Sequence, residues 1–201
     1  MILAYDGASV DGSLYLDVVG LARRSPGWLD DLVSAWSTYG LLLFALLMCV
    51  AWWRARSSAP TVAVTALAAP LITLLAFGVD DLLKLAVRED RPCRSLRTAT
   101  LEICPPPGDW SFPSNHAALA AAAAVALLFA SRRLGSIALV AALLMAASRV
   151  WVGVHYPHDV LAGLIVGTLV ALPSAWAART KLAPFAERLT TTRLRPLLVG
   201  S

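Results

Sequence analysis

Five long stretches of this chain lack Asp, Glu, Lys and Arg, and they restrict the fold more than any other feature. They cover residues 36–53, 61–79, 116–130, 135–147 and 160–178. A soluble core does not need such runs, whereas a membrane-spanning helix needs about 20 apolar residues. Charged residues make up only 15% of the chain, against about a quarter in soluble domains. The pattern therefore predicts an all-α integral membrane helix bundle rather than a soluble α/β domain.

The chain has 201 residues with no Ser- or Gly-rich linker and no internal repeat, so we expect a single domain over 1–201. Residues 1–35 mix apolar and charged residues, and no run there reaches spanning length. This segment is expected to form amphipathic helices at the membrane interface. Five transmembrane helices follow, or six if residues 10–35 also span. Asp17, Arg23 and Arg24 argue against a sixth, because charges within the bilayer are costly.

Positive charges are concentrated in three short segments, which follow the first, third and fifth apolar runs. Of the 17 basic and 13 acidic residues, nine basic and one acidic lie there. Lys and Arg mark cytoplasmic loops, so these segments and the tail 179–201 are predicted to be cytoplasmic. The N-terminus, a long loop over 80–115 and the loop around His155 are then external. The nine residues are Arg54, Arg56, Arg132, Arg133, Arg179, Lys181, Arg188, Arg193 and Arg195.

Two cysteines, Cys93 and Cys104, lie in the predicted external loop. An extracytoplasmic compartment is oxidising, so a disulfide between them is expected there. Two free thiols are the alternative. Neither cysteine has the close Cys/His spacing of a zinc site.

Three clusters of polar residues are predicted at the external ends of the helices. They are Lys84 with Arg91, then Ser114, Asn115 and His116, and finally Arg149, His155 and Asp159. Together they supply three permanent cations, two imidazoles, a hydroxyl and a carboxylate. Cationic side chains donate strong hydrogen bonds to phosphate oxygens, and the free N–H groups at a helix start also attract anions. The clusters therefore predict a site for a tetrahedral dianion.

Taken singly, these residues have simpler interpretations. Lys84 and Arg91 could be ordinary loop charges, and Asp159 could be a helix N-cap. Arg149 is harder to explain in this way, because charges deep in apolar runs are usually functional. His158 is interpreted as a neighbour of the site rather than a participant. Solvated loop charges are expected at Arg88, Arg94 and Arg97.

The order and spacing of the clusters resemble the type 2 phosphatidic acid phosphatase (PAP2) superfamily. The family pattern is K-x6-R-P, P-S-G-H and S-R-x5-H-x3-D. This chain has Lys84-x6-Arg91-Pro92, Pro113-Ser114-Asn115-His116 and Ser148-Arg149-x5-His155-x3-Asp159. Asn115 replaces the glycine, although asparagine tolerates unusual backbone angles better than most residues. The resemblance is closest to undecaprenyl-diphosphate phosphatases of the bacitracin-resistance type, which also have a polar residue there and resemble residues 149–157.

This resemblance implies a metal-independent lipid phosphatase that works through a phosphohistidine. His155 would be the nucleophile, Asp159 its orienting carboxylate, and His116 the group that gives and takes protons. The implied phosphate ligands are Lys84, Arg91, Ser114, Asn115 and Arg149. No cofactor is expected. The expected reaction converts undecaprenyl or decaprenyl diphosphate to the monophosphate at the outer face of a bacterial plasma membrane, as part of cell wall biosynthesis.

Other lipid phosphates suit the same chemistry, namely phosphatidylglycerophosphate, phosphatidic acid or a prenyl-phosphoryl pentose phosphate. A non-catalytic lipid-binding or transport protein is a further alternative, but it would not need two histidines and an aspartate. A metal site built from His116, His155, His158 and Asp159 is disfavoured by the neighbouring cations. The superfamily also holds soluble vanadium-dependent haloperoxidases, which the apolar runs disfavour. The expected partner is a membrane lipid and not a nucleic acid, and the oligomeric state is open.

Overall fold

The structure is a computed structural model that describes residues 6–200, apart from the side chains of Ala183 and Leu189. Residues 1–5 of the expected interfacial segment and residue 201 of the expected tail lie outside this range. The described chain is helical with no strand, which confirms the predicted class. The helices are α1 (Ala8–Ala22), α2 (Gly27–Tyr39), α3 (Leu41–Ala55), α4 (Pro60–Val87), α5 (Pro92–Ser95), α6 (Asn115–Ala130), α7 (Arg132–Trp151), α8 (Pro157–Lys181), α9 (Ala183–Leu189) and α10 (Arg195–Leu198).

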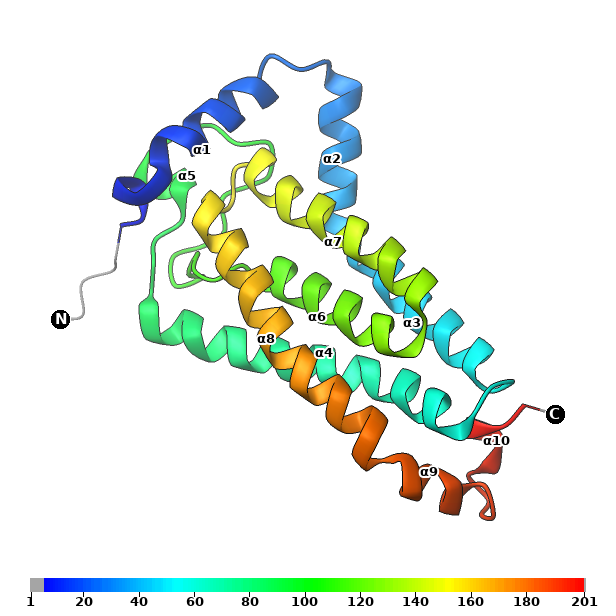
Figure 1. The fold of residues 1–201 in the computed structure, drawn as a ribbon. Helices are drawn as coiled ribbons and strands as arrows, with labels where there is room; N and C mark the ends of the chain where they lie inside the picture. Colours follow the sequence, from blue (N-terminus) through cyan, green and yellow to red (C-terminus); the bar gives the residue numbers. More distant parts are fainter. Residues whose placement is uncertain (1–5, 201) are drawn as a thin grey trace.

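Helix α6 is the centre of the bundle and is enclosed by α4, α7 and α8 (Figure 1). Its sequence is dominated by alanine, and most of these alanines are fully buried. Small residues let helix backbones approach closely. On α8, a Cβ added at Gly163 would lie 2.5 Å from the Ser114 carbonyl oxygen, and one at Gly167 would lie 2.2 Å from the Ala118 carbonyl oxygen. These glycines therefore set the position of the start of α6.

The number of candidate spans is lower than the five or six expected from the apolar runs. By length and hydropathy α4, α7 and α8 could each cross a membrane, and α2 with α3 forms a fourth candidate bent by 53°. The third run folds as α6, whose 16 residues are fewer than the about 20 that a vertical span needs. The described helices thus support up to four candidate spans, with a shorter apolar helix packed among them.

The N-terminal part differs from a purely interfacial segment. Helix α1 lies across the end of the bundle (Figure 1) and is not a candidate span. Helix α2 begins at Gly27 and continues through the expected boundary at residue 35 into the first apolar run. The run is broken at Gly40, where a Cβ would lie 2.5 Å from the Trp36 carbonyl oxygen. Glycine therefore permits the bend that joins α2 to α3.

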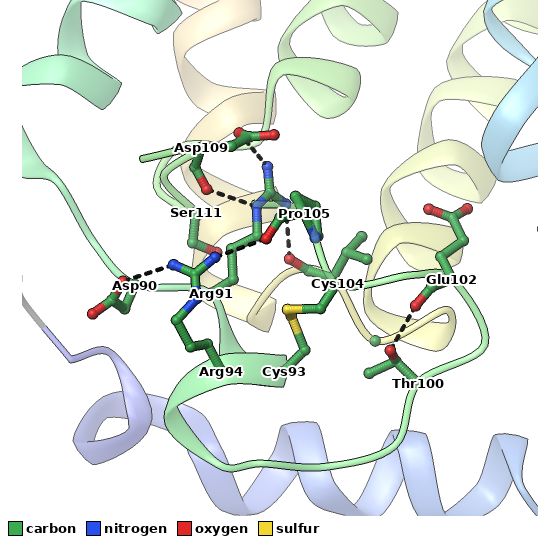
Figure 2. Close-up of a disulfide and its surroundings, with 12 residues drawn as sticks. Asp90, Arg91, Cys93, Arg94, Thr100, Glu102, Cys104, Pro105, Asp109 and Ser111 are labelled. Atoms are coloured by element: carbon green, nitrogen blue, oxygen red, sulfur yellow. Dashed lines mark hydrogen bonds and ion pairs between the residues drawn. A yellow bond between two sulfur atoms is a disulfide. The ribbon is translucent and has the colours of Figure 1, made fainter. Parts of the chain in front are cut away.

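The expected loop over 80–115 is shorter in the structure, because α4 continues to Val87 and carries Asp80 and Lys84. The helix ends at Arg88 in a left-handed conformation with φ 55°. The remaining loop contains α5 and is cross-linked by a disulfide between Cys93 and Cys104 (Figure 2).

The expected tail from residue 179 also contains helix. Helix α8 runs to Lys181, and α9 and α10 then pack back against α4 at the end of the bundle opposite α1 (Figure 1). The indole of Trp52 on α3 donates to the Leu197 carbonyl at 2.8 Å. The C-terminal residues are thus folded against the bundle.

Candidate active site

The predicted site residues come together at the end of the bundle covered by α1 and the disulfide loop. Lys84 lies near the end of α4, His116 near the start of α6, Arg149 near the end of α7, and Asp159 in the first turn of α8. His155 lies in the short connection between α7 and α8, within the electrostatic influence of Lys84, Arg149 and His116. Sequence segments more than 70 residues apart therefore form one site.

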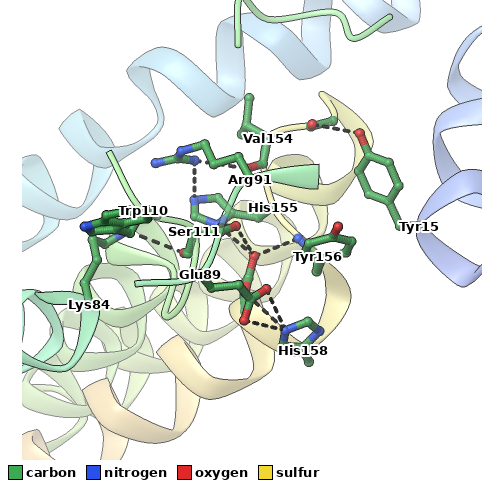
Figure 3. A network of polar contacts seen from close by, with 12 residues as sticks. Tyr15, Lys84, Glu89, Arg91, Trp110, Ser111, Val154, His155, Tyr156 and His158 are labelled. Atoms are coloured by element: carbon green, nitrogen blue, oxygen red, sulfur yellow. Dashed lines mark hydrogen bonds and ion pairs between the residues drawn. The ribbon is translucent and has the colours of Figure 1, made fainter. Parts of the chain in front are cut away.

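His155 is buried and has different partners on its two ring nitrogens (Figure 3). Nδ1 lies 3.2 Å from Oδ2 of Asp159, and Nε2 lies 3.2 Å from Nη1 of Arg91. A guanidinium has only donors, so Nε2 must accept and the ring proton is on Nδ1. Burial lowers the pKa of His155 well below its usual range, and the charges of Arg91, Lys84 and Arg149 lower it further. His155 is thus a neutral imidazole with the lone pair of Nε2 towards the cations.

Asp159 is fully buried and joins His155 to the start of α8. Its Oδ2 accepts from the backbone N–H of Tyr156 at 2.8 Å and from the hydroxyl of Ser111 at 2.5 Å. Asp159 is therefore not the N-cap residue, which is Tyr156, but the third residue of the helix in a capping box. The oxygen that accepts from the N-cap N–H also contacts the His155 ring. These partners fix the carboxylate in one position.

The three cations are held by the 88–114 loop and by α2. Lys84 Nζ donates to the Trp110 carbonyl at 2.8 Å, and Arg91 forms an ion pair of 2.8 Å with Asp109. Arg149 contacts the Ser37 hydroxyl and forms an ion pair of 3.2 Å with Glu102. Each arginine of the site thus already has a carboxylate partner from the loop.

The start of α6 supplies the second cluster. Ser114 is the N-cap residue, and its buried Oγ has no hydrogen-bond partner among the residues described. Asn115 is the first helical residue, and it is not one of the non-glycine residues with positive φ, which within residues 6–200 are Arg88 and Arg97. Asparagine in place of the family glycine therefore causes no backbone strain. His116 is half-buried beside it.

Several residues of this site were not singled out from the sequence. Ser111, Asp109 and Glu102 lie in the polar loop, where nothing in their spacing distinguishes them from solvated residues. Asp80 is fully buried on α4, and neither of its oxygens has a partner within residues 6–200. Asp80 directly follows the second apolar run and lies four residues, about one helical turn, before Lys84. This spacing could have marked it as part of the site, because a carboxylate and a cation on one face of an apolar helix are seldom accidental.

The structure does not bring together the four residues of the disfavoured metal site, His116, His155, His158 and Asp159. Instead, Glu89, His158 and Asp159 each place one ligand atom within 4.8 Å of the others. His155 contacts Asp159 through Nδ1, but its other ring nitrogen, Nε2, faces Arg91, and His155 does not belong to this group. A cation bound between the two histidines would also meet the positive charges of the site.

Comparisons with known proteins agree with this geometry. The model of the PAP2 superfamily matches residues 65–182, which include every site residue considered above from Lys84 to Asp159. The chain belongs to the PAP2 superfamily. It is 32% identical over 142 residues to undecaprenyl-diphosphatase BcrC of Bacillus subtilis, a match that covers 71% of each protein. The predicted family is therefore confirmed.

Two further comparisons extend this result. The chain is 34% identical over 131 residues to a decaprenylphosphoryl-5-phosphoribose phosphatase of Mycobacterium tuberculosis, covering 65% of this chain and 67% of that protein. Its fold is similar to that of Aquifex aeolicus LpxE, with a TM-score of 0.60 and 24% identity over 86% of this chain and 98% of the other. The chain described here is therefore a membrane phosphatase of the PAP2 lipid phosphatase family, as predicted.

Proposed function

We propose that this protein hydrolyses polyprenyl diphosphate, such as undecaprenyl or decaprenyl diphosphate, to the monophosphate at the outer face of a bacterial plasma membrane. The observation that carries the proposal is the contact of Arg91 with Nε2 of His155. Because of this contact, the neutral ring of His155 directs the lone pair of Nε2 towards Arg91, where the phosphate would be bound. The similarity to an undecaprenyl-diphosphatase and to a decaprenylphosphoryl-5-phosphoribose phosphatase favours a polyprenyl chain, and the charge distribution along the sequence favours the outer face.

In the first step, Nε2 of His155 attacks the terminal phosphorus and a P–N bond forms. Burial and the charges of Arg149, Arg91 and Lys84 lower the pKa of His116 to about 4, and the negative diphosphate raises it when bound, so that His116 enters the step as an imidazolium. The bond from phosphorus to the bridging oxygen breaks, and this imidazolium donates its proton to that oxygen as polyprenyl monophosphate leaves. Asp159 accepts the Nδ1–H of His155 at 3.2 Å and stabilises the positive ring that forms. Lys84, Arg91 and Arg149 bind the phosphoryl oxygens, because fixed cations stabilise charge that develops in the transition state.

In the second step, water attacks the phosphohistidine. His116, now neutral, takes a proton from the water, the P–N bond breaks, and inorganic phosphate is released with His155 restored. Ser114 Oγ, which has no partner within the described part of the chain, and the free N–H groups at the start of α6 assist binding of the oxygens. No step requires a metal.

The lipid chain has a suitable place beside the cations. An apolar groove of about 350 Å³ lies between α2 and α7, and its lining includes Trp36, Ser148 and Trp151. Ser148 is adjacent to Arg149, whose guanidinium contacts Ser37 of α2. We assign this groove to the first part of the polyprenyl chain, with the diphosphate at Arg149.

The test is phosphate release from undecaprenyl diphosphate by the purified protein in detergent with EDTA. The controls are the His155→Ala variant, phosphatidic acid, and a decaprenylphosphoryl pentose phosphate as competing lipid. We expect rapid release that is lost in the variant, with vanadate still bound by it. Release only from another lipid would replace the substrate, and release from none would favour a binding or transport role.

A further inference from the structure

His158 lies in a cluster of carboxylates that the proposed reaction does not use. Its Nδ1 is 2.8 Å from Asp11 on α1, and its Nε2 is 3.0 Å from Glu89, which follows α4. The same Nε2 lies 3.4 Å from Oδ1 of Asp159. Figure 3 shows Glu89 between the His155 and His158 sides of the network. The ring stacks on Tyr156 at 5.3 Å, so its orientation is fixed.

Both ring nitrogens of His158 face carboxylate oxygens. An ionised carboxylate only accepts hydrogen bonds, so both nitrogens must donate for both contacts to be hydrogen bonds. A ring that donates from both nitrogens is the positively charged imidazolium. The surroundings favour this state, since Asp11, Glu89 and Asp159 are the charged groups that face the ring and the aromatic neighbours are neutral.

The two inner carboxylates need this cation. Glu89 is 1% exposed and Asp159 is fully buried, and each has an oxygen in the group that lies within 4.8 Å. Two buried carboxylates this close repel each other, and one of them takes up a proton unless a cation lies between them. A protonated Asp159 would accept the Nδ1–H of His155 only as a neutral acid, which is a weaker acceptor. It would also no longer stabilise the positive ring that forms when His155 attacks phosphorus.

We propose that His158 is a positioning residue, which as an imidazolium keeps Asp159 ionised and directed at His155 and at the same time anchors α1 over the site. This inference rests on the proposed function. It differs from a purely structural anchor because its effect passes through the charge of Asp159. The two oxygens of Asp159 therefore each contact a histidine, a neutral His155 at Oδ2 and a positively charged His158 at Oδ1.

The test compares His158→Gln with the wild-type protein in detergent, measuring kcat and KM on polyprenyl diphosphate from pH 5 to pH 9. We expect kcat near neutral pH to fall by about 10-fold to 100-fold, with KM changed by less than about twofold. The acid limb of the kcat profile should move to higher pH by about one unit or more. Adding Glu89→Gln should restore most of kcat, since the repelling charge is then removed together with its counter-ion.

Asp11→Asn is the matched control for loss of the α1 anchor. It weakens the contact with α1 but leaves the imidazolium beside Glu89 and Asp159, so the acid limb should stay in place. An unshifted profile in His158→Gln, or failure of Glu89→Gln to restore kcat, would overturn the proposal. So would one bound divalent ion per purified chain that is lost in His158→Gln, because His158 would then be a metal ligand.

Failure of the proposed function can be distinguished from failure of the proposal for His158. If the wild-type protein released no phosphate from any lipid, the assigned reaction would be wrong. The charge of His158 would still be tested by imidazole 15N shifts of the wild-type protein. A doubly protonated ring at neutral pH is expected, and a neutral ring would overturn the inference without reference to activity.

Discussion

His155 and His158 contact the two oxygens of Asp159 from opposite electrostatic surroundings. His155 faces Arg91 and the other cations of the site, whereas His158 faces Asp11 and Glu89. Only two residues, Tyr156 and Pro157, therefore separate a neutral ring suited to attack phosphorus from a ring that carries a positive charge. The identity of a histidine does not decide its role, because neighbouring charges select its protonation state.

The lowered pKa of His155 makes the folded protein sensitive to acid. An unfolded chain binds a proton on this histidine below about pH 6.5, whereas the folded chain resists it because of burial and of the Arg91 charge. Stability is then lost as the pH falls below that value. We expect the midpoint of thermal unfolding to fall between pH 7.5 and pH 5.5, and to fall less in His155→Gln. An equal fall in both proteins would contradict this assignment.

Glu102 competes with substrate for Arg149, if Arg149 binds phosphate as proposed. The two side chains form an ion pair of 3.2 Å, with the Glu102 side chain 24% exposed. Such a partly exposed pair is worth about 1 kcal/mol or less. Glu102→Gln should lower KM by up to about fivefold with little change in kcat. The control is Glu187→Gln on α9, where the carboxylate is exposed, and an unchanged KM in Glu102→Gln would argue against competition.

At the scale of elements, the contact between α6 and α8 positions the start of α6. Gly163 has the Ser114 carbonyl against it, and Ser114 is the N-cap of the helix that carries His116. We expect Gly163→Ala to displace this helix start and reduce kcat at least tenfold, because small displacements of catalytic groups are costly. Gly78→Ala on α4 is the matched control, since nothing lies within 4 Å of its added Cβ. Equal activity of both variants would show that the contact is unimportant.

The disulfide holds the loop that supplies the partners of the cations. Cys93 and Cys104 are 11 residues apart, and closing a loop of this size stabilises a fold by about 3 kcal/mol in the chain-entropy model. Cys93→Ser with Cys104→Ser should lower the unfolding midpoint and raise KM, because Arg91 and Asp109 lie in the same loop. Reduction of the wild-type protein should have the same effect. A reduced protein with unchanged midpoint and KM would contradict this role.

At the scale of the whole molecule, we propose that the active site faces the outside of the membrane and the C-terminal helices face the cytoplasm. Arg97 is an exposed residue between the two cysteines of the disulfide, and Arg193 is an exposed residue between α9 and α10. These two helices lie at the end of the bundle opposite α1 (Figure 1). In a Cys49→Ala background, an impermeant thiol reagent should label Arg97→Cys on intact cells. Arg193→Cys should be labelled only after the cells are permeabilised. The reverse pattern would place the site inside, against the charge distribution.

Much of the candidate site can be predicted from the sequence. Lys84, Arg91, Arg149, His155 and Asp159 are recognisable because their order and spacing together fit the PAP2 pattern, although Lys84 and Arg91 taken singly could be ordinary loop charges. Ser111, Asp109 and Glu102 were not recognisable, since they are polar residues in a polar loop and belong to no such pattern. The sequence favours His158 as a neighbour of the site, because Asp159 suits His155 one helical turn away. The carboxylate partners of His158, Asp11 and Glu89, are distant in sequence and are brought to it only by the fold.

The apolar runs by themselves determined a helical membrane bundle, and the motifs determined its family through their resemblance to the PAP2 pattern, because both can be read along one chain. Only the tertiary structure decided which runs are long enough to span, where α4 ends, and which carboxylates pair with the cations. Those outcomes depend on contacts between segments far apart in sequence. The central place of α6 among α4, α7 and α8 and the carboxylates around His158 arise from such contacts, and local pattern does not encode them.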